Sequence, residues 1–565
     1  MSHYRWNVLP PVPENHALNH SGFSPLVRQL LHNRGITDST RIQSFLTTDS
    51  SQLNDPFLLP DMHQSIARIH RALLSGESIA VYGDYDVDGI TATAILVRGL
   101  SALDGRATPY IPHRLAEGYG LTTTALEKLH SQGISLVITV DCGITSLAEV
   151  KRARKSGLDI IITDHHAPLP EMPPAVAVVN PKLPESVYPF SELTGAGLAF
   201  KLLQALFISL GKETLVDQFF DLAALGTIAD VAPLVAENRF LVKEGLEAIN
   251  TRPRLGIETI ATQCGLSPGN LTAENVSWVI APRLNAAGRL AHALTSYNLL
   301  IADSPQTARE LASWLDNKNS ERQKLTATDL SRARTQVLAR GNTPLLLASD
   351  REYHLGIAGL VAGRLSEEFY RPAVVVRTGE KVSSGSCRSI PEFNIIAALT
   401  QANRLLSRFG GHSQAAGFTL PTRNLPRLDE HLSTLAADQL EGIDLRPSLD
   451  IDALVSLPEL GGDTFPAIQQ LAPFGRGNPL PTFLSRGVEV VDCRTMGNGS
   501  EHIRLKLRQN GTVWDCVGFR LGCYLAEVSP RLDIVYNLEI DCWGGIEKLR
   551  LNLLDFAPAG QSGAG

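Results

Sequence analysis

Three carboxylates in one short stretch give the first indication of chemistry. Asp84, Asp86 and Asp88 occupy alternate positions. They follow the apolar run 79–81 and precede Gly89. If a strand continued through them, their side chains would share one side of the backbone and would repel one another unless a cation lay between them. Gly89 permits a turn, and the residues after it predict a helix, so we expect the acids at the carboxyl end of a strand in a βα unit.

A simpler interpretation of this stretch is an acidic strand-to-helix loop in which one aspartate caps the helix. Two further apolar runs, 136–140 and 160–163, favour the metal interpretation because each ends in potential ligands. The candidates that follow these runs and one later helix-like stretch are Asp141, Asp164, His165, His166 and Asp230. Carboxylates with an imidazole suit Mn²⁺ or Mg²⁺, whereas the lack of paired cysteines argues against a structural zinc.

At these residues the chain resembles a known family. The motifs are Asp-Tyr-Asp-Val-Asp-Gly (84–89), Asp-Cys-Gly (141–143), Asp-His-His (164–166) and Ala-Asp-Val-Ala-Pro-Leu (229–234). Together they resemble the DHH phosphoesterase superfamily and, within it, the RecJ exonucleases, which degrade single-stranded DNA from its 5′ end. The resemblance covers nearly the whole chain. It implies an α/β fold with a parallel-sheet DHH domain, a long connector helix, a smaller α/β DHH-associated domain and a C-terminal β-barrel of oligonucleotide-binding (OB) type.

The resemblance also implies a catalytic centre with two divalent ions, Mn²⁺ or Mg²⁺, that share one aspartate. The expected metal ligands are Asp84, Asp86, Asp88, Asp141, His165 and Asp230, with Asp84 acting either directly or from outside the ligand set. The expected catalytic residues are Asp141, His165, His166 and Asp164. His166 would point at the substrate phosphate, and Asp164 would orient the histidines through a hydrogen bond. Tyr82 stands where related sequences often have histidine, which puts one ligand in question.

The organisation of the chain follows from its length and periodicity. With 565 residues, 44% of them apolar, the chain is too long for one core. Apolar runs alternate with helical stretches from about 76 to 180, which predicts a parallel sheet, and 303–340 predicts a long, mostly polar connecting helix. The predicted domains are 1–45 (N-terminal helical lead-in), 46–275 (DHH), 276–342 (connector), 343–442 (DHH-associated), 443–557 (OB) and 558–565 (disordered tail).

Two small-residue segments, 383–389 and 409–418, are expected to be loops that permit close backbone approach. The resemblance makes them part of a site for the terminal phosphate of the substrate. The residues expected to bind this phosphate are Arg289, Arg364, Ser386, Arg388 and His412. An arginine that caps a helix carboxyl end is the alternative interpretation of Arg289.

One strand in the predicted barrel has a basic face. His502, Arg504, Lys506 and Arg508 alternate with Ile503, Leu505 and Leu507. This alternation places all the basic groups on one side. The face is either an ordinary solvated surface or a track for DNA phosphates, which would consist of Arg504, Lys506 and Arg508.

Charge and targeting signals limit the partners. The net charge of −7 requires any polyanion site to be local. The sequence has no apolar run long enough for a membrane span and no signal-peptide core, so we expect a cytoplasmic protein with no membrane partner. Seven scattered cysteines predict reduced thiols. The expected partners are single-stranded DNA and, from the resemblance, single-strand-binding protein and a repair helicase; we expect a monomer.

The predicted function is 5′-to-3′ hydrolysis of single-stranded DNA to 5′-mononucleotides in DNA repair and recombination. One alternative is a small-substrate DHH phosphoesterase acting on nanoRNA, pAp or a cyclic dinucleotide. The predicted barrel and connector weigh against it, because a small substrate needs neither. A second alternative is a non-catalytic DNA-binding scaffold. The intact acids and histidines weigh against that hypothesis.

Overall fold

The chain divides into two units in the computed structural model, which describes residues 2–14, 16, 18, 22–47, 49–114, 116–541 and 547–561. The larger unit comprises Ser50–Ile443 and Gly475–Gly477. The smaller unit comprises Met1–Asp49, Asp444–Phe474 and Asn478–Gly565. Within the described residues, every helix is too short or too polar to span a bilayer.

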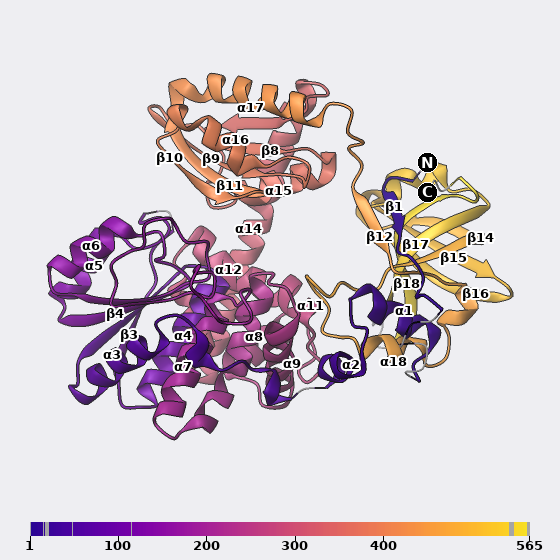
Figure 1. The fold of residues 1–565 in the computed structure, drawn as a ribbon. Coiled ribbons are helices and arrows are strands. Elements are labelled where there is room, and N and C mark those ends of the chain that lie inside the picture. The colour runs from indigo at the N-terminus through magenta and orange to yellow at the C-terminus, as the bar shows by residue number, and fades with distance from the viewer. Residues whose placement is uncertain are drawn as a thin grey trace. The chain divides into compact units, whose positions relative to one another are not determined.

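Five parallel strands form the first sheet of the larger unit, in the order β3-β2-β4-β5-β6. They are β2 (Ser78–Gly83), β3 (Arg106–Tyr110), β4 (Ile134–Val140), β5 (Asp159–Thr163) and β6 (Ala177–Val179). Helices α3 (Met62–Leu74), α4 (Val87–Ser101) and α7 (Gly195–Ser209) cover one face, and α5 (Thr123–Ser131) and α6 (Leu147–Lys155) cover the other (Figure 1). The continuous apolar runs of the sequence therefore correspond to strands buried on both sides, and the predicted parallel sheet is confirmed.

A helical region follows the sheet. It consists of α8 (Phe220–Ala229), α9 (Ala236–Thr251), α10 (Leu255–Gln263), α11 (Ala273–Asn275), the π-helix η5 (Val276–Ile280), α12 (Ala281–Leu290) and α13 (Leu294–Leu300). The long helix α14 (Pro305–Ala339) then leads to the second sheet. Its buried residues recur every three or four positions within 308–319 and within 329–337, while its other faces are polar, as predicted for a connector.

The second sheet of the larger unit is mixed, with the order β10-β11-β9-β8-β7. Its strands are β7 (Leu346–Asp350), β8 (Ala373–Arg377), β9 (Val382–Arg388), β10 (Arg408–His412) and β11 (Ala415–Pro421). The accompanying helices are α15 (Ala358–Phe369), α16 (Ile395–Gln401) and α17 (Leu425–Leu440). Only the β7–β8 pair is parallel among the described strands of this sheet.

The two segments expected to be loops are strands instead. Residues 383–389 lie mostly in β9, and 409–418 form much of the β10–β11 hairpin. Serine and glycine are infrequent in strands, which is why the sequence was misleading. The missing side-chain volume has a packing function, because a Cβ on Gly385 would lie 2.5 Å from the ring of Phe418.

The smaller unit contains a closed five-stranded barrel, as predicted. Its strands are β14 (Phe483–Met496), β15 (His502–Gln509), β16 (Thr512–Gly518), β17 (Arg531–Asp541) and β18 (Lys548–Pro558). β14 pairs with both β15 and β17, which closes the barrel, and the short strand β13 (Ala453–Leu454) pairs in parallel with the start of β14. Residues 559–561 of the predicted disordered tail are exposed, and 562–565 lie outside the described residues.

The N-terminal segment folds with this barrel. β1 (Arg5–Val8) pairs in parallel with β12 (Ser448–Ile451), and the Trp6 indole donates a 2.7 Å hydrogen bond to Asp555. Helices α1 (Pro25–Asn33) and α2 (Ser39–Leu46) contribute apolar side chains to the barrel core. The two ends of the sequence thus form one core.

A buried ion pair secures the start of the larger unit. The Lys201 ammonium lies 2.9 Å from a carboxylate oxygen of Glu237, and both side chains are 0% exposed. Glu237 also accepts hydrogen bonds from the Tyr188 hydroxyl (2.6 Å) and from the backbone and side-chain nitrogens of Asn54 (3.1 and 2.9 Å). One carboxylate therefore joins α7, α9 and the chain before η3 (Pro56–Leu58).

We expect Glu237→Ala to destabilise the larger unit by about 3–5 kcal/mol, because it leaves the Lys201 ammonium buried without a counter-charge. Chemical denaturation of the full chain, followed by circular dichroism, measures this loss. Glu171→Ala is the matched control: its partner Lys151 is half exposed, so the change should be at most about 1 kcal/mol. Equal effects of the two substitutions would contradict the structural importance of the buried pair.

Candidate functional site

The carboxyl ends of β2, β4 and β5 meet at one edge of the first sheet, and each is followed by a predicted ligand. Three groups of side chains have ligand atoms that lie within 4.8 Å of one another. They are Asp141 with His165 and His166, Asp88 with His165 and Asp230, and Asp84 with Asp86 and Asp141. The structure thus brings together every predicted metal ligand, as expected for the switch region of an open parallel sheet.

The three acids after β2 do not converge in the way that the sequence predicted. The strand ends at Gly83, and α4 begins at Val87, before Gly89. Asp86 is the N-cap of α4, and its carboxylate accepts from the backbone N–H of Gly89 (3.2 Å). Asp84 and Asp88 approach from the loop and from the first helical turn, so helix geometry rather than strand alternation unites the acids. The simpler interpretation of a capping aspartate is correct for Asp86, yet it does not exclude the cluster.

Asp88 also joins two helices. Its two carboxylate oxygens accept from the backbone N–H groups of Gly195 (2.6 Å) and Ala196 (2.8 Å), at the amino end of α7. The partial positive charge of this helix end stabilises the carboxylate. Gly226 on α8 leaves room for this approach, since a Cβ there would lie 2.8 Å from the Asp88 oxygen.

Asp141 occupies a strained and crowded position. Its φ of +61° lies in the left-handed region, which is uncommon for residues other than glycine. A Cβ on Gly195 would lie 2.4 Å from the Cβ of Asp141. The first residue of α7 must therefore be small for Asp141 to reach the cluster.

The two histidines have different electrostatic environments. His165 Nε2 lies 3.0 Å from Asp141 and 3.8 Å from Asp88. Burial and the charge of His166 lower the pKa of His165 to about 3, so its ring is neutral and offers a lone pair to a metal. For His166, burial opposes protonation, but the hydrogen bond and charge of Asp164 raise its pKa to about 9. His166 is therefore a cation suited to a phosphate oxygen.

Asp164 orients only one of these rings. Its carboxylate accepts from the His166 ring (2.7 Å), from the His166 backbone (3.0 Å) and from the Ile144 backbone (2.9 Å). Burial alone would raise the pKa of Asp164, but these contacts lower it overall. The prediction that Asp164 orients both histidines is wrong, because the His165 ring is directed at Asp141 instead.

The acids repel one another in the absence of a cation. Burial and neighbouring carboxylates raise the pKa values of Asp84 and Asp141 far above normal, and burial and Asp86 raise that of Asp88 to about 7. One buried oxygen of Asp84 has no hydrogen-bond partner among the described residues. Hard carboxylate oxygens, a neutral imidazole and this orphaned oxygen fit divalent cations such as Mn²⁺ or Mg²⁺. Tyr82 is not part of the site: it is buried on the other sheet face and donates to Gly120.

The predicted phosphate binders gather where α12 meets the second sheet. The Arg289 guanidinium donates to the Gly356 carbonyl (3.4 Å) rather than capping its own helix. The Arg388 guanidinium lies against Gly359, where a Cβ would be 3.2 Å from it. Burial and the charges of Arg114, Arg322 and Arg388 lower the pKa of Arg289 to about 9. These guanidiniums have no ion-pair partner among the described residues, so their proximity is consistent with the predicted anion site.

The other predicted binders lie around this pair. The His412 ring is parallel to that of His166, with centroids 6.4 Å apart, so the second sheet reaches the acidic centre. Ser386 is partly buried on β9, opposite Gly417. Arg364 is exposed on α15 and pairs with Glu367 at 3.5 Å, which makes it the outermost member.

Sequence reasoning missed two residues of the loop between β3 and α5. The Arg114 guanidinium stacks over the Tyr85 ring at 4.8 Å. The Tyr119 hydroxyl lies 3.3 Å from His166 Nδ1 and 3.5 Å from the Asp141 carbonyl. A signal was available: Gly118 and Gly120, both with positive φ, flank Tyr119 and indicate a backbone shaped around one side chain.

The basic face of β15 is partly neutralised. Its alternation is as predicted, with Ile503, Leu505 and Leu507 buried. However, Arg504 lies 3.3 Å from Asp515, and Arg508 lies 2.6 Å from Glu489. Lys506 is exposed between Asp492 and Asp515 on the neighbouring strands. Any phosphate on this track must therefore compete with carboxylates.

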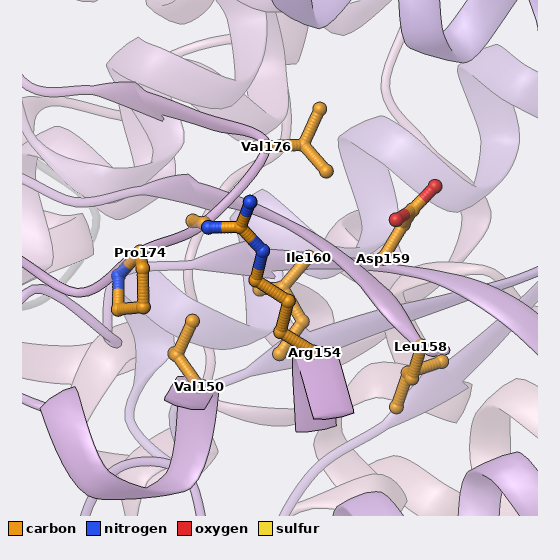
Figure 2. Close-up of a pocket in the computed structure, with 8 residues that line it drawn as sticks. Val150, Arg154, Leu158, Asp159, Ile160, Pro174 and Val176 are labelled. Carbon is orange, nitrogen blue, oxygen red and sulfur yellow. The ribbon is translucent and has the colours of Figure 1, made fainter. Parts of the chain in front are cut away.

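A hollow of about 270 Å³ lies at the opposite, amino edge of the first sheet. Figure 2 shows Arg154 there among Val150, Pro174 and Val176. The adjoining Asp159 carboxylate is already bound by Arg68 at 2.6 Å. The hollow has no cluster of candidate ligands among its lining residues, so the chemistry belongs to the carboxyl edge.

Comparisons with known proteins agree with this geometry. Family models match at residues 78–227 (DHH family, N-terminal domain), 342–438 (DHHA1 domain) and 451–555 (RecJ OB domain). The single-stranded-DNA-specific exonuclease RecJ of Bacillus subtilis is 37% identical over 539 residues, covering 94% of this chain and 68% of that protein. RecJ of Thermus thermophilus is 39% identical over 492 residues, covering 86% and 69%. The crystal structure of Thermus thermophilus RecJ in complex with Mn²⁺ matches with a TM-score of 0.84 and 32% identity, over 98% of this chain and 79% of that one.

We expect Gly195→Ala to weaken Mn²⁺ binding by about 1–3 kcal/mol, the usual cost of overpacking, because the added methyl would displace Asp141. Isothermal titration with Mn²⁺ measures the change. Gly197→Ala on the same helix is the control: its Cβ would lie 3.2 Å from the flexible Leu193 side chain and at ordinary contact distance, 3.7 Å, from the Thr194 hydroxyl. Unchanged Mn²⁺ affinity in Gly195→Ala would show that Asp141 does not belong to the metal site.

Proposed function

Because the chain belongs to the RecJ family of single-stranded-DNA-specific exonucleases, we propose that it degrades such strands from the 5′ end and releases 5′-mononucleotides. The chain is a metal-dependent exonuclease with Mn²⁺ or Mg²⁺ as cofactor. The proposed polarity rests on one observation. An acidic centre and a pocket of arginines that have no described ion-pair partner lie in the same unit, and the contact between Arg289 and Gly356 connects them. DNA repair and recombination are the processes that use this activity.

The acidic centre would hold two cations through the six predicted ligands, and Asp141 belongs to two of the three side-chain groups that could hold one. When bound, divalent cations withdraw charge from phosphoryl oxygens and make hydroxide available near neutral pH. The protein's own groups position the substrate. The protonated His166 ring, fixed by Asp164, would hold a nonbridging oxygen of the scissile phosphate, and Tyr119 limits how that ring can rotate.

Direction would come from the arginine pocket. Arg289 and Arg388, with Ser386 and His412 nearby, would bind the 5′-terminal phosphate and so fix its distance from the acids. Arginine suits this role because its fork can donate two hydrogen bonds to one phosphate. Arg364 would contribute long-range charge rather than a direct contact, given its exposure and its pairing with Glu367.

The alternative functions have less support. A small-substrate phosphoesterase has no use for a closed barrel, and a non-catalytic scaffold has no need of a buried acidic centre. For the barrel, we propose that Arg504, Lys506 and Arg508 contact the DNA backbone. Single-strand-binding protein and a repair helicase as partners, a monomeric state and a cytoplasmic location remain predictions.

With Mn²⁺, we expect a single-stranded oligonucleotide to shorten from its 5′ end, while a blunt duplex remains intact. Two labelling schemes, at the 5′ and at the 3′ terminus, resolve the polarity on denaturing gels. Asp141→Ala should lose at least about 10³-fold in rate, as when a central electrostatic group is removed, and its circular dichroism spectrum should match the wild type. Shortening from the 3′ end would refute the proposed direction.

We expect Arg388→Gln to reduce kcat/KM on 5′-phosphorylated strands by about tenfold, the loss of one charge-assisted contact, and to have little effect on 5′-hydroxyl strands. Initial rates on the two substrates give the ratio. Arg377→Gln, at the exposed end of β8, should leave both rates unchanged. If Arg388→Gln slowed both substrates equally, the terminal-phosphate pocket would have to lie elsewhere.

A further inference from the structure

Helix α14 carries a partly buried arginine, Arg322, that has no ion-pair partner among the residues that the structure describes. The buried stripe of the helix includes Leu315, Asn319, Asp329 and Ala333, and Arg322 falls on the same stripe by helical periodicity. Arg322 Nε is buried and has no hydrogen-bond partner in the part of the chain that the structure describes.

This stripe faces the arginine pocket. The Asp329 carboxylate accepts from the backbone N–H of His354 (3.0 Å), in the turn that leads to Gly356. Gly356 in turn accepts from Arg289. The influence of Arg322 on the Arg289 pKa, which burial and neighbouring arginines lower, fits this proximity.

No carboxylate of the acidic centre is among the charges that act on Arg322. Arg114 stacks on Tyr85, beside Asp84, and Asp86 acts on Arg289. The charges that act on Arg322 are instead those of two further arginines, Arg364 and Arg283. Along α14, Arg322 lies between Asp316, which pairs with Arg283 at 2.8 Å, and Asp329, which contacts the turn before Gly356.

We propose that Arg322 forms a subsite for a second phosphoryl group at the 5′ terminus, so that the enzyme accepts strands that end in a 5′-diphosphate or 5′-triphosphate. The proposal rests on the proposed terminal-phosphate pocket. A 5′-monophosphate carries at most two negative charges, which Arg114, Arg289 and Arg388 already oppose. A buried and unpaired guanidinium nitrogen such as Arg322 Nε is costly without an anion, and a β-phosphate would supply one.

The first reaction cycle on such a strand balances without a further reactant. The oxygen of water bonds to the phosphorus of the first internucleotide linkage, the bond from that phosphorus to the 3′-oxygen breaks, and the 3′-oxygen takes up a proton. The first product is a nucleoside 5′-triphosphate, and the remaining strand begins with a 5′-monophosphate. Only this first cycle uses the Arg322 subsite.

The test uses the full-length enzyme with Mn²⁺ and one single-stranded DNA sequence that carries a 5′-hydroxyl, a 5′-monophosphate or a 5′-triphosphate. Release of the first nucleotide, identified by mass spectrometry, gives kcat/KM for each end. We expect the wild type to cleave the triphosphate strand at least as well as the monophosphate strand. Arg322→Gln should lower kcat/KM about tenfold on the triphosphate strand and less than about twofold on the monophosphate strand.

Arg332→Gln, exposed on the same helix, is the matched control and should behave as the wild type. Arg322→Lys keeps the charge and should retain part of the triphosphate rate, which covers the case in which the glutamine variant folds poorly.

A wild type that cleaves the triphosphate strand no better than the hydroxyl strand would overturn the proposal. So would an equal loss on monophosphate and triphosphate strands in Arg322→Gln, which would place Arg322 at the terminal or an internal phosphate. If the proposed terminal-phosphate pocket itself were wrong, the result would differ, because the wild type would then cleave 5′-monophosphate and 5′-hydroxyl strands equally well.

Discussion

Electrostatic repulsion among buried carboxylates is the constraint on which the larger unit depends. Asp84, Asp88 and Asp141 lie at the edge of a buried sheet, and burial together with mutual repulsion raises their pKa values. Such a cluster is stable as anions only with cations between its members. The surrounding structure keeps the acids together nonetheless: the amino end of α7 donates two hydrogen bonds to Asp88, and Gly195 leaves room for Asp141. The fold thereby maintains a site whose charge requires a ligand.

The arginine pocket is also a cluster of like charges that requires a ligand, but its charges are positive and its ligand must be an anion. Burial and neighbouring guanidiniums lower the pKa of Arg289, and Arg322 Nε has no described partner. The two clusters lie close enough for their charges to interact, as the effect of Asp86 on Arg289 indicates. A DNA strand satisfies both clusters when one of its phosphates lies at the acids with their cations and another lies at the arginines. The close contact of Gly356 with Arg289, where no side chain would fit, keeps the spacing between them short.

The sequence predicted the parts of this arrangement that depend on strand ends. Asp141 and His165 follow neighbouring parallel strands, and parallel strands bring their carboxyl ends to one edge. The sequence could not predict that Asp88 reaches the cluster from the first turn of a helix, because this depends on where α4 begins. It mistook β9 and the β10–β11 hairpin for loops, because some small residues there serve local packing: a Cβ on Gly385 would meet Phe418, and a Cβ on Gly411 would meet Ala415 and Ala416. No local sequence signal predicts the pairing of β1 with β12. In the sequence, Arg322 is one of many charged residues on a polar helix, and only the structure shows that its Nε is buried without a described partner.

Metal chemistry alone has no preference for either end of a strand, so polarity must come from an asymmetric feature. The arginine pocket is such a feature, because it lies on one side of the acids. Breaking the bond between phosphorus and the 3′-oxygen leaves a phosphate on the new 5′ terminus. Each cycle therefore regenerates the group that the pocket binds, and the shortened strand can occupy the same site after moving by one nucleotide. Cleavage on the other side of the phosphorus would leave a hydroxyl there, and the arginines would have nothing to bind. The side of the phosphorus that is cleaved and the position of the pocket are thus two aspects of one constraint.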